Sequence, residues 1–191
     1  MTRILFPLLL SVVLSVPAQA QRVAIETELG TLEIALEPAK APRTTANFLR
    51  YVDAGAYMGG RFHRAVTKDT QPQNKVKIEV VQAGAAREDK DFPPIPLERT
   101  KETGLRHLDG TISMARGTQD SATSDFFICI GDQPELDFGG RRNPDGQGFA
   151  AFGRVVKGME VVRRIQGRPA QGQTLVPPVR ILVVRRLPPG P

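Results

Sequence analysis

The chain has 191 residues, of which 40% are hydrophobic and 24% charged, and a formal net charge of +6. A single cysteine excludes an internal disulfide, and two isolated histidines argue against a metal site, so we expect neither metal nor cofactor. The basic residues are scattered and no aromatic residues interleave with them to stack on bases, which argues against nucleic-acid binding.

The first twenty residues have the pattern of a secretory signal peptide. A positive start at Arg3 precedes the apolar run "ILFPLLLSVVLSV", and Ala18-Gln19-Ala20 forms an A-x-A cleavage pattern. The apolar run is too short to span a bilayer. We therefore expect a signal peptide over residues 1–20, an exported protein that is periplasmic or secreted, and no membrane attachment after cleavage.

Residues 21–191 are expected to form one domain, with two helices among many strands. The helix over 41–57 has Pro42 in its first turn and an apolar stripe that stops near Gly55; a second, short helix is bracketed by Gly158 and Gly167. Strands are predicted, in chain order, as a pair within 22–38 and then around 62–64 and over 76–85, 110–117, 124–131, 149–156 and 179–187.

The segments between these elements are polar and rich in glycine and proline. Loops are predicted over residues 67–75, 117–124 and 139–148, and an irregular, proline-rich excursion over 87–102. Many short strands with two helices far apart indicate a mainly β fold, a closed antiparallel barrel. Cys129, in the apolar run "FFICIG", is expected to be buried in its core.

The stretch "GRFHRAV" presents a conflict with simple strand alternation. Phe62 and Arg64 would share one face of a strand, although one is a core residue type and the other carries a permanent charge. We therefore expect a bend or bulge near these residues. His63 is expected to have a structural role.

Four segments in sequence order resemble the signature blocks of the cyclophilins, the peptidyl-prolyl cis-trans isomerases. They are "PRTTANFLRYVDAGAY", "GRFHRAV", "GTISMARG" with "SATSDFFICIGD", and "ELDFGG" with "GFAAFGRVVKGMEVV". The resemblance extends from about Arg22 to Leu187. It implies an eight-stranded antiparallel barrel capped by two helices. It also implies a peptidyl-prolyl isomerase that acts on unfolded or proline-containing polypeptides, and we expect a monomer.

The resemblance also implies an active site. Arg64 matches the catalytic arginine of the family and Gln82 the glutamine that orients it. The positions that match substrate-binding residues of the family are Val80, Ala115, Arg116, Phe127, Leu136 and Phe149. Phe62, Met114 and Phe126 match supporting core residues.

Such a site needs no nucleophile, metal or proton transfer. Rotation about the X-Pro bond is slow because the nitrogen lone pair is delocalised into the carbonyl group. When the bond twists, the proline nitrogen becomes pyramidal and can accept a hydrogen bond. A guanidinium aimed at this nitrogen would bind only the transition state, and an apolar pocket would hold the ring.

Several positions depart from the family pattern. Glu79 and Val80 replace phenylalanine and methionine, Glu135 replaces an aromatic residue, and Asp125 replaces a glutamine. Residues 67–76 add length between Arg64 and Gln82. Asp125 could pair with Arg64 and hold it, or divert it from the substrate.

These departures leave two alternatives to the enzyme. One is a cyclophilin-fold module that binds proline-containing peptides with little or no turnover, with three carboxylates near the groove suiting basic peptides. The other is a structural barrel in which Arg64 forms a surface salt bridge. The first alternative depends on whether Val80, Phe127 and Leu136 still enclose a proline ring.

Overall fold

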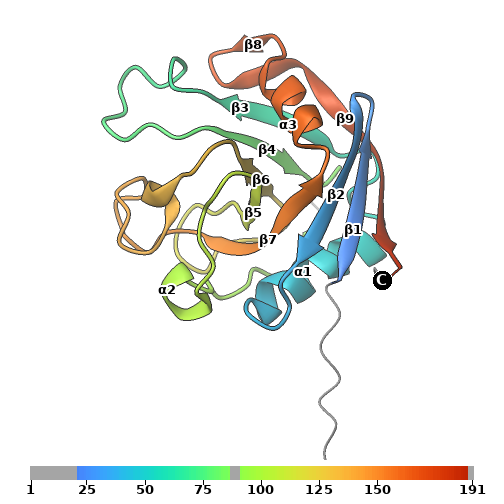
Figure 1. Ribbon diagram of the computed structural model, residues 1–191, viewed down its shortest axis with the longest axis horizontal. Coiled ribbons are helices and arrows are strands. Elements are labelled where there is room, and N and C mark those ends of the chain that lie inside the picture. The colour runs from blue at the N-terminus through green and yellow to red at the C-terminus, as the bar shows by residue number, and fades with distance from the viewer. Residues whose placement is uncertain (1–20, 87–90, 189–191) are drawn as a thin grey trace, which may run out of the picture.

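The computed structural model describes residues 21–86 and 91–188, so the predicted signal peptide lies outside the described residues. Figure 1 shows the arrangement of the elements. The strands are β1 (Arg22–Thr27), β2 (Gly30–Leu36), β3 (Arg61–Val66), β4 (Val80–Gly84), β5 (Thr111–Met114), β6 (Phe126–Cys129), β7 (Ala150–Lys157), β8 (Ala170–Gln171) and β9 (Thr174–Leu187). The helices are α1 (Pro42–Asp53), α2 (Thr100–Thr103), the 3-10 helix η2 (Pro134–Leu136) and α3 (Met159–Gln166).

Eight of the strands close into an antiparallel barrel. Their order is β1-β2-β7-β5-β6-β4-β3-β9, and pairing of β1 with β9 closes the ring. The mainly β, eight-stranded antiparallel barrel expected from the sequence is therefore confirmed. The two-residue strand β8 was not expected; it lies outside the barrel and pairs with β9.

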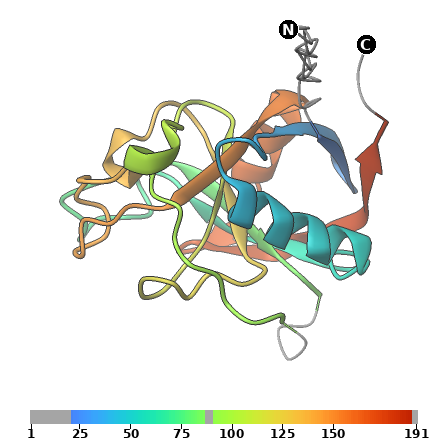
Figure 2. The ribbon, with the colours of Figure 1, turned by 90° about the horizontal axis from the view of Figure 1, so that it is seen from below.

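The two predicted helices are present, and they cover opposite ends of the barrel. In Figures 1 and 2, α1 lies at one end and α3 at the other. Pro42 stands in the first turn of α1, where its missing N–H costs no hydrogen bond. A further helix, α2, was not expected and begins inside the segment predicted to be irregular. It ends at Gly104, whose φ of 71° is accessible to glycine.

The interior divides into two hydrophobic clusters on opposite faces of the sheet. The larger one fills the barrel and contains Phe62, Met114 and Phe126, as the sequence predicted. The smaller one contains Val66, Ile78, Val80, Phe127, Cys129 and Leu136. Cys129 is fully buried, as expected. Phe126 and Phe127 thus face opposite sides because successive side chains on a strand alternate.

A β-bulge in β3 resolves the conflict between Phe62 and Arg64. Phe62 pairs with Ala83 and Arg64 with Gln82, so two steps along β3 correspond to one step along β4. His63 is the extra residue. The bulge turns Arg64 away from the barrel interior, while Phe62 stays fully buried.

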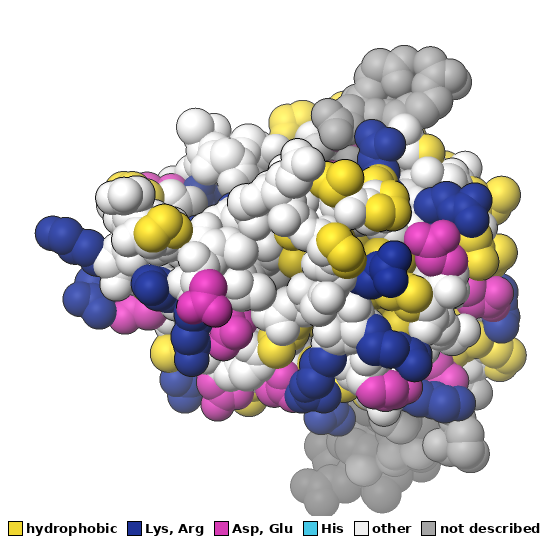
Figure 3. All heavy atoms as spheres, turned by 90° about the horizontal axis from the view of Figure 1, so that it is seen from above, with side chains coloured by type: hydrophobic (Ala, Val, Ile, Leu, Met, Phe, Trp, Pro, Cys, Tyr) yellow, Lys and Arg dark blue, Asp and Glu magenta, His cyan; other side chains and the backbone are white. Residues whose placement is uncertain are grey.

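The surface carries charged side chains of both signs. On the face in Figure 3, basic and acidic side chains lie interspersed. Several form ion pairs, such as Arg186 with Asp53 at 2.6 Å and Arg180 with Glu28 at 3.0 Å. Within residues 21–86 and 91–188, no helix is long and apolar enough to cross a membrane.

Candidate active site

Arg64 is half-buried and is held by two glutamine side chains. Its Nη1 donates to Oε1 of Gln82 at 2.9 Å, and its Nε and Nη2 donate to Oε1 of Gln173 at 2.9 and 2.6 Å. These bonds use three of the five N–H groups of the guanidinium. Two N–H groups have no acceptor within the described residues and remain available to a substrate.

Burial lowers the pKa of Arg64 from its ordinary value. Arginine side chains are not deprotonated in proteins at neutral pH, so Arg64 is a cation in the site. Neither glutamine neutralises it, and Arg64 forms no ion pair with any residue in 21–86 or 91–188. This finding removes the alternative in which Arg64 serves a surface salt bridge.

Gln82 is placed between Arg64 and Phe127 by strand register. It lies opposite Arg64 on β3 and opposite Phe127 on β6, so the three side chains lie side by side on one face. Its Nε2 donates to Oδ2 of Asp125 at 2.8 Å. This bond sets the orientation of the amide and directs its oxygen toward Arg64.

Asp125 approaches the sheet closely because Gly84 has no side chain. A Cβ on Gly84 would lie 2.0 Å from Oδ1 of Asp125. The sequence left open whether Asp125 pairs with Arg64 or diverts it. In the structure Asp125 is connected to Arg64 through Gln82, which forms a hydrogen bond with each of them. Asp125 also lies 3.5 Å from His63.

A cavity of about 160 Å³ lies beside the Arg64 guanidinium. All eight residues predicted for the site line it: Arg64, Gln82, Val80, Ala115, Arg116, Phe127, Leu136 and Phe149. Val80, Phe127 and Leu136 are at most 5% exposed and belong to the smaller hydrophobic cluster. The volume is below the roughly 300–1,000 Å³ of pockets for drug-sized ligands, so it suits a single side chain.

Sequence reasoning missed Ile78 and Arg142, which also line this cavity, and Gln173, which holds Arg64. The added residues 67–76 were a signal for Ile78, because they place extra chain next to Arg64 and Ile78 follows them closely in the sequence. Gln173 lies in the turn between β8 and β9, and nothing in its sequence surroundings points to Arg64. Arg142 was predicted only as part of the loop over residues 139–148.

The added segment forms an ordered wall around the buried side chain of Gln71. Nε2 of Gln71 donates to the carbonyl oxygens of Thr67 at 2.7 Å and Ile78 at 2.8 Å. These bonds bring Ile78 into the cavity wall. Figures 1 and 2 show the β3–β4 loop and the loop that follows η2 projecting from the same side of the barrel.

Phe127 is fixed between two other rings. Phe149 meets it edge to face at 5.4 Å, and the imidazole of His107 stacks on it at 5.9 Å. His107 is itself held by Asp137 at 2.7 Å and Ser113 at 3.0 Å. Burial alone would raise the pKa of Asp137, but the hydrogen bonds from His107 lower it below its ordinary value.

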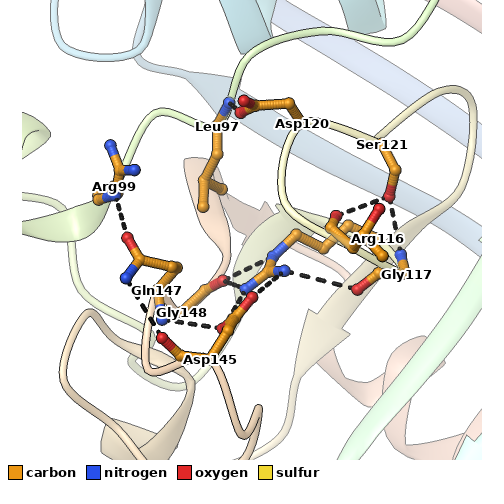
Figure 4. A network of polar contacts seen from close by, with 10 residues as sticks. Leu97, Arg99, Arg116, Gly117, Asp120, Ser121, Asp145, Gln147 and Gly148 are labelled. Atoms are coloured by element: carbon orange, nitrogen blue, oxygen red, sulfur yellow. Dashed lines mark hydrogen bonds and ion pairs between the residues drawn. The ribbon is translucent and has the colours of Figure 1, made fainter.

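Arg116 anchors the loop that bears Phe149. Its side chain is 1% exposed and forms two bonds with Asp145, at 2.8 and 2.9 Å, and two with the carbonyl oxygen of Gly148, at 2.9 and 2.7 Å (Figure 4). The guanidinium lies 5.1 Å from the centre of the Phe149 ring. Arg116 thus holds the pocket edge in place.

The carboxylates that favoured binding of basic peptides already have partners on the chain. Glu79 pairs with Lys68 at 3.6 Å, and Glu135 pairs with Arg141 at 2.8 Å. Asp125 accepts a hydrogen bond from Gln82. Within the described residues there is also no group of three or more histidine, cysteine or acidic side chains able to hold a metal.

The sequence profile described as "Cyclophilin type peptidyl-prolyl cis-trans isomerase/CLD" matches residues 22–186. The chain belongs to the cyclophilin family. Relatives of this cyclophilin include peptidyl-prolyl cis-trans isomerase A of Dickeya dadantii, 42% identical over 75% of the chain and 70% of the relative, and peptidyl-prolyl cis-trans isomerase B of Escherichia coli, 35% identical over 76% and 84%. Family and relatives support an enzyme of the peptidyl-prolyl cis-trans isomerase class.

Solved structures share the fold of this cyclophilin. A cyclophilin-type peptidyl-prolyl cis-trans isomerase of Cryptosporidium parvum superposes with a TM-score of 0.72 at 20% identity, covering 90% of this chain and 99% of that one. The same protein in the presence of the dipeptide Ala-Pro gives a TM-score of 0.69 at 21% identity, covering 86% and 97%.

Proposed function

We propose that this cyclophilin is an exported prolyl isomerase that accelerates cis-trans exchange of X-Pro bonds in unfolded or folding polypeptides. The observation that supports it is the position of Arg64. Its guanidinium is fixed by Gln82 and Gln173 beside an apolar cavity and keeps two free N–H groups. The proline ring would enter the cavity formed by Val80, Phe127 and Leu136.

In this mechanism the peptide rotates while its proline ring is held. The proline nitrogen becomes pyramidal in the transition state, and an N–H group of Arg64 donates to it. The planar ground-state amide offers no such lone pair, so the bond stabilises the transition state selectively. Gln82 and Gln173 keep the guanidinium oriented and limit the entropy lost when the bond forms.

The magnitudes show that Arg64 needs help from the pocket. A hydrogen bond to a charged group is worth about 1.5–3 kcal/mol, and each tenfold in rate corresponds to about 1.4 kcal/mol. One bond therefore supplies roughly ten- to a hundredfold. Exclusion of water by Val80, Phe127, Leu136 and Phe149 would supply the rest, because a dry site strengthens the bond.

Export and the monomeric state belong to the same proposal. The positive start, apolar run and A-x-A pattern of residues 1–20 support secretion into the periplasm or beyond. Mass spectrometry of the protein exported from a bacterial host is expected to give Gln21 as the first residue. Size-exclusion chromatography with light scattering is expected to give the mass of one chain. The Ala-Pro dipeptide of the structural neighbour supports proline-containing polypeptides as substrates.

The deciding experiment measures isomerisation of a short Ala-Pro peptide by the protein and by Arg64→Ala. We expect kcat/KM to fall by about ten- to a hundredfold in the variant. Arg61→Ala is the matched control, because Arg61 lies on the same strand and is exposed. Arg64→Lys keeps the charge but loses the planar group and is expected to recover only part of the rate.

Equal activity of the protein and Arg64→Ala would refute the role of Arg64. Absence of turnover in folded protein, together with binding of the peptide, would establish the module that binds proline-containing peptides without catalysis. Circular dichroism and thermal unfolding of each variant separate these outcomes from loss of folding.

A further inference from the structure

A second arginine, Arg142, lines the same cavity as Arg64. It belongs to the loop between η2 and β7, and its Nη1 donates to Oε1 of Gln71 at 2.8 Å and to the carbonyl oxygen of Val76 at 2.9 Å. Both acceptors lie in the added β3–β4 loop. Arg142 therefore joins two loops that the sequence treated as separate surface segments.

The bonds of Arg142 leave one edge of its guanidinium open. Nη1 uses both of its N–H groups on Gln71 and Val76. Nε and Nη2 have no acceptor within residues 21–86 and 91–188. This Nε–Nη2 edge is the planar fork that binds a carboxylate through two parallel hydrogen bonds.

The two arginines also leave positive charge uncompensated at the cavity. Neither Arg64 nor Arg142 forms an ion pair with a described residue. Neighbouring arginines behave differently: Arg141 pairs with Glu135 and Arg116 with Asp145. Burial, and next the charge of Arg64, lower the pKa of Arg142, which places the two cations in the same electrostatic environment.

We propose that this cavity selects proline-containing segments with an acidic residue next to the proline, whose carboxylate binds the Nε–Nη2 edge of Arg142. The proposal rests on the proposed function, because the proline ring must occupy the pocket beside Arg64. It reverses the preference for basic peptides that Glu79, Asp125 and Glu135 suggested. Glu79 and Glu135 have cationic partners on the chain, whereas the cations at the cavity have neutral ones.

The buried side chain of Gln71 helps to hold Arg142 at the cavity. Gln71 is 1% exposed, and its amide oxygen accepts from both Arg142 and the backbone N–H of Ile78, at 3.3 Å. The same glutamine thus supports an apolar wall and a charged wall. A proline ring against Ile78 and Val80 would bring its neighbouring residues toward Arg142.

The test compares peptides of one length in which the residue before or after the proline is glutamate, glutamine or lysine. For the full protein we expect kcat/KM with glutamate to exceed that with glutamine by about three- to tenfold in at least one of the two positions, with lysine lowest. The ratio should decrease from low to high salt, because salt screens partly exposed charges. Equal values for the three residues in both positions would overturn the proposal.

Arg142→Gln is expected to bring the glutamate-to-glutamine ratio close to one, and Arg142→Lys to retain part of it. Arg141→Gln is the matched control, because its side chain is 77% exposed and points its charge at Glu135. A ratio that persists in Arg142→Gln, or disappears equally in Arg141→Gln, would overturn the assignment to Arg142. The ratio is measured within each variant, so a general loss of activity does not imitate the effect.

Failure of the inference and failure of the proposed function give different results. Turnover of all peptides at equal rates overturns the acidic preference and leaves the isomerase intact. If no peptide is turned over, fluorescence anisotropy of labelled glutamate and glutamine peptides decides the preference by binding alone. Tighter binding of the glutamate peptide that is lost in Arg142→Gln would support it, and equal binding would overturn it.

Discussion

The amide oxygen of Gln173 accepts two hydrogen bonds from Arg64, from Nε at 2.9 Å and Nη2 at 2.6 Å. The two residues are far apart in the sequence and meet because β9 pairs with β3, with Thr174 opposite Arg64, and the backbone N–H of Ala65 donates to the carbonyl oxygen of Gln173 at 2.9 Å. The Nε2 of Gln173 donates to the carbonyl oxygen of Thr70 at 3.1 Å, which fixes the amide. Gln173 therefore positions the guanidinium without touching the cavity.

Replacing Gln173 with alanine is expected to lower kcat/KM about tenfold, because Arg64 loses an acceptor that orients it, at about 1.4 kcal/mol per tenfold. The midpoint of thermal unfolding should change little. Gln171→Ala, an exposed glutamine in β8, is the matched control. Gln173→Glu keeps an acceptor and is expected to recover part of the activity; failure of both variants to alter kcat/KM would contradict the positioning role.

Asp125 is expected to act on Arg64 through Gln82. Asp125→Ala should lower kcat/KM several-fold in the protein, and should have almost no further effect in a Gln82→Ala background. Such non-additivity is the signature of residues in one hydrogen-bond network. Glu79→Ala, which removes a nearby carboxylate paired with Lys68, is the control. Additive effects of Asp125→Ala and Gln82→Ala would show that the two residues act independently.

Asp145→Asn is expected to lower the free energy of unfolding by about 1–2 kcal/mol, because the buried Arg116 loses its charged partner. KM for the peptide should rise as well, since Arg116 supports Phe149 at the pocket edge. Asp53→Asn removes a comparable two-bond pair with Arg186 on the exposed surface. That control should cost less than about 1 kcal/mol in urea unfolding. Equal costs would show that burial of Arg116 is unimportant.

Stability is expected to fall on acidification. The pKa of Asp137 is lowered by the His107 hydrogen bonds against burial, and those of Asp145 and Asp53 are lowered by their arginine partners. Each carboxyl group therefore binds protons more weakly in the folded state than in the unfolded one. Their contribution is complete above the ordinary aspartate pKa of 3.8 and is lost as the pH falls through the folded values.

Urea unfolding between pH 7 and pH 2 checks this expectation. The midpoint should stay nearly constant down to about pH 5 and decrease below about pH 4. The decrease should be smaller in Asp145→Asn, which has one such group fewer. A midpoint that increases on acidification would contradict the assignment.

The sequence by itself determined the barrel and most of the pocket. Alternation of apolar residues specified the strands, and glycine and proline specified their ends, because these are local properties of the backbone. A bend or bulge near Phe62 and Arg64 was also expected, since one strand face cannot hold both side chains, and the structure has a bulge at His63. Family signature blocks placed Arg64, Gln82 and Phe127 near one another, and the register of β3, β4 and β6 brings them together.

Only the tertiary structure decided what surrounds these residues. Gln173 reaches Arg64 through a turn, and Arg142 reaches the cavity through two loops, so no local pattern records either contact. Charge is the clearest case: the sequence placed three carboxylates near the groove, but folding pairs Glu79 with Lys68 and Glu135 with Arg141. Which charges remain uncompensated depends on distances across the fold, because an ion pair acts only over a few ångströms.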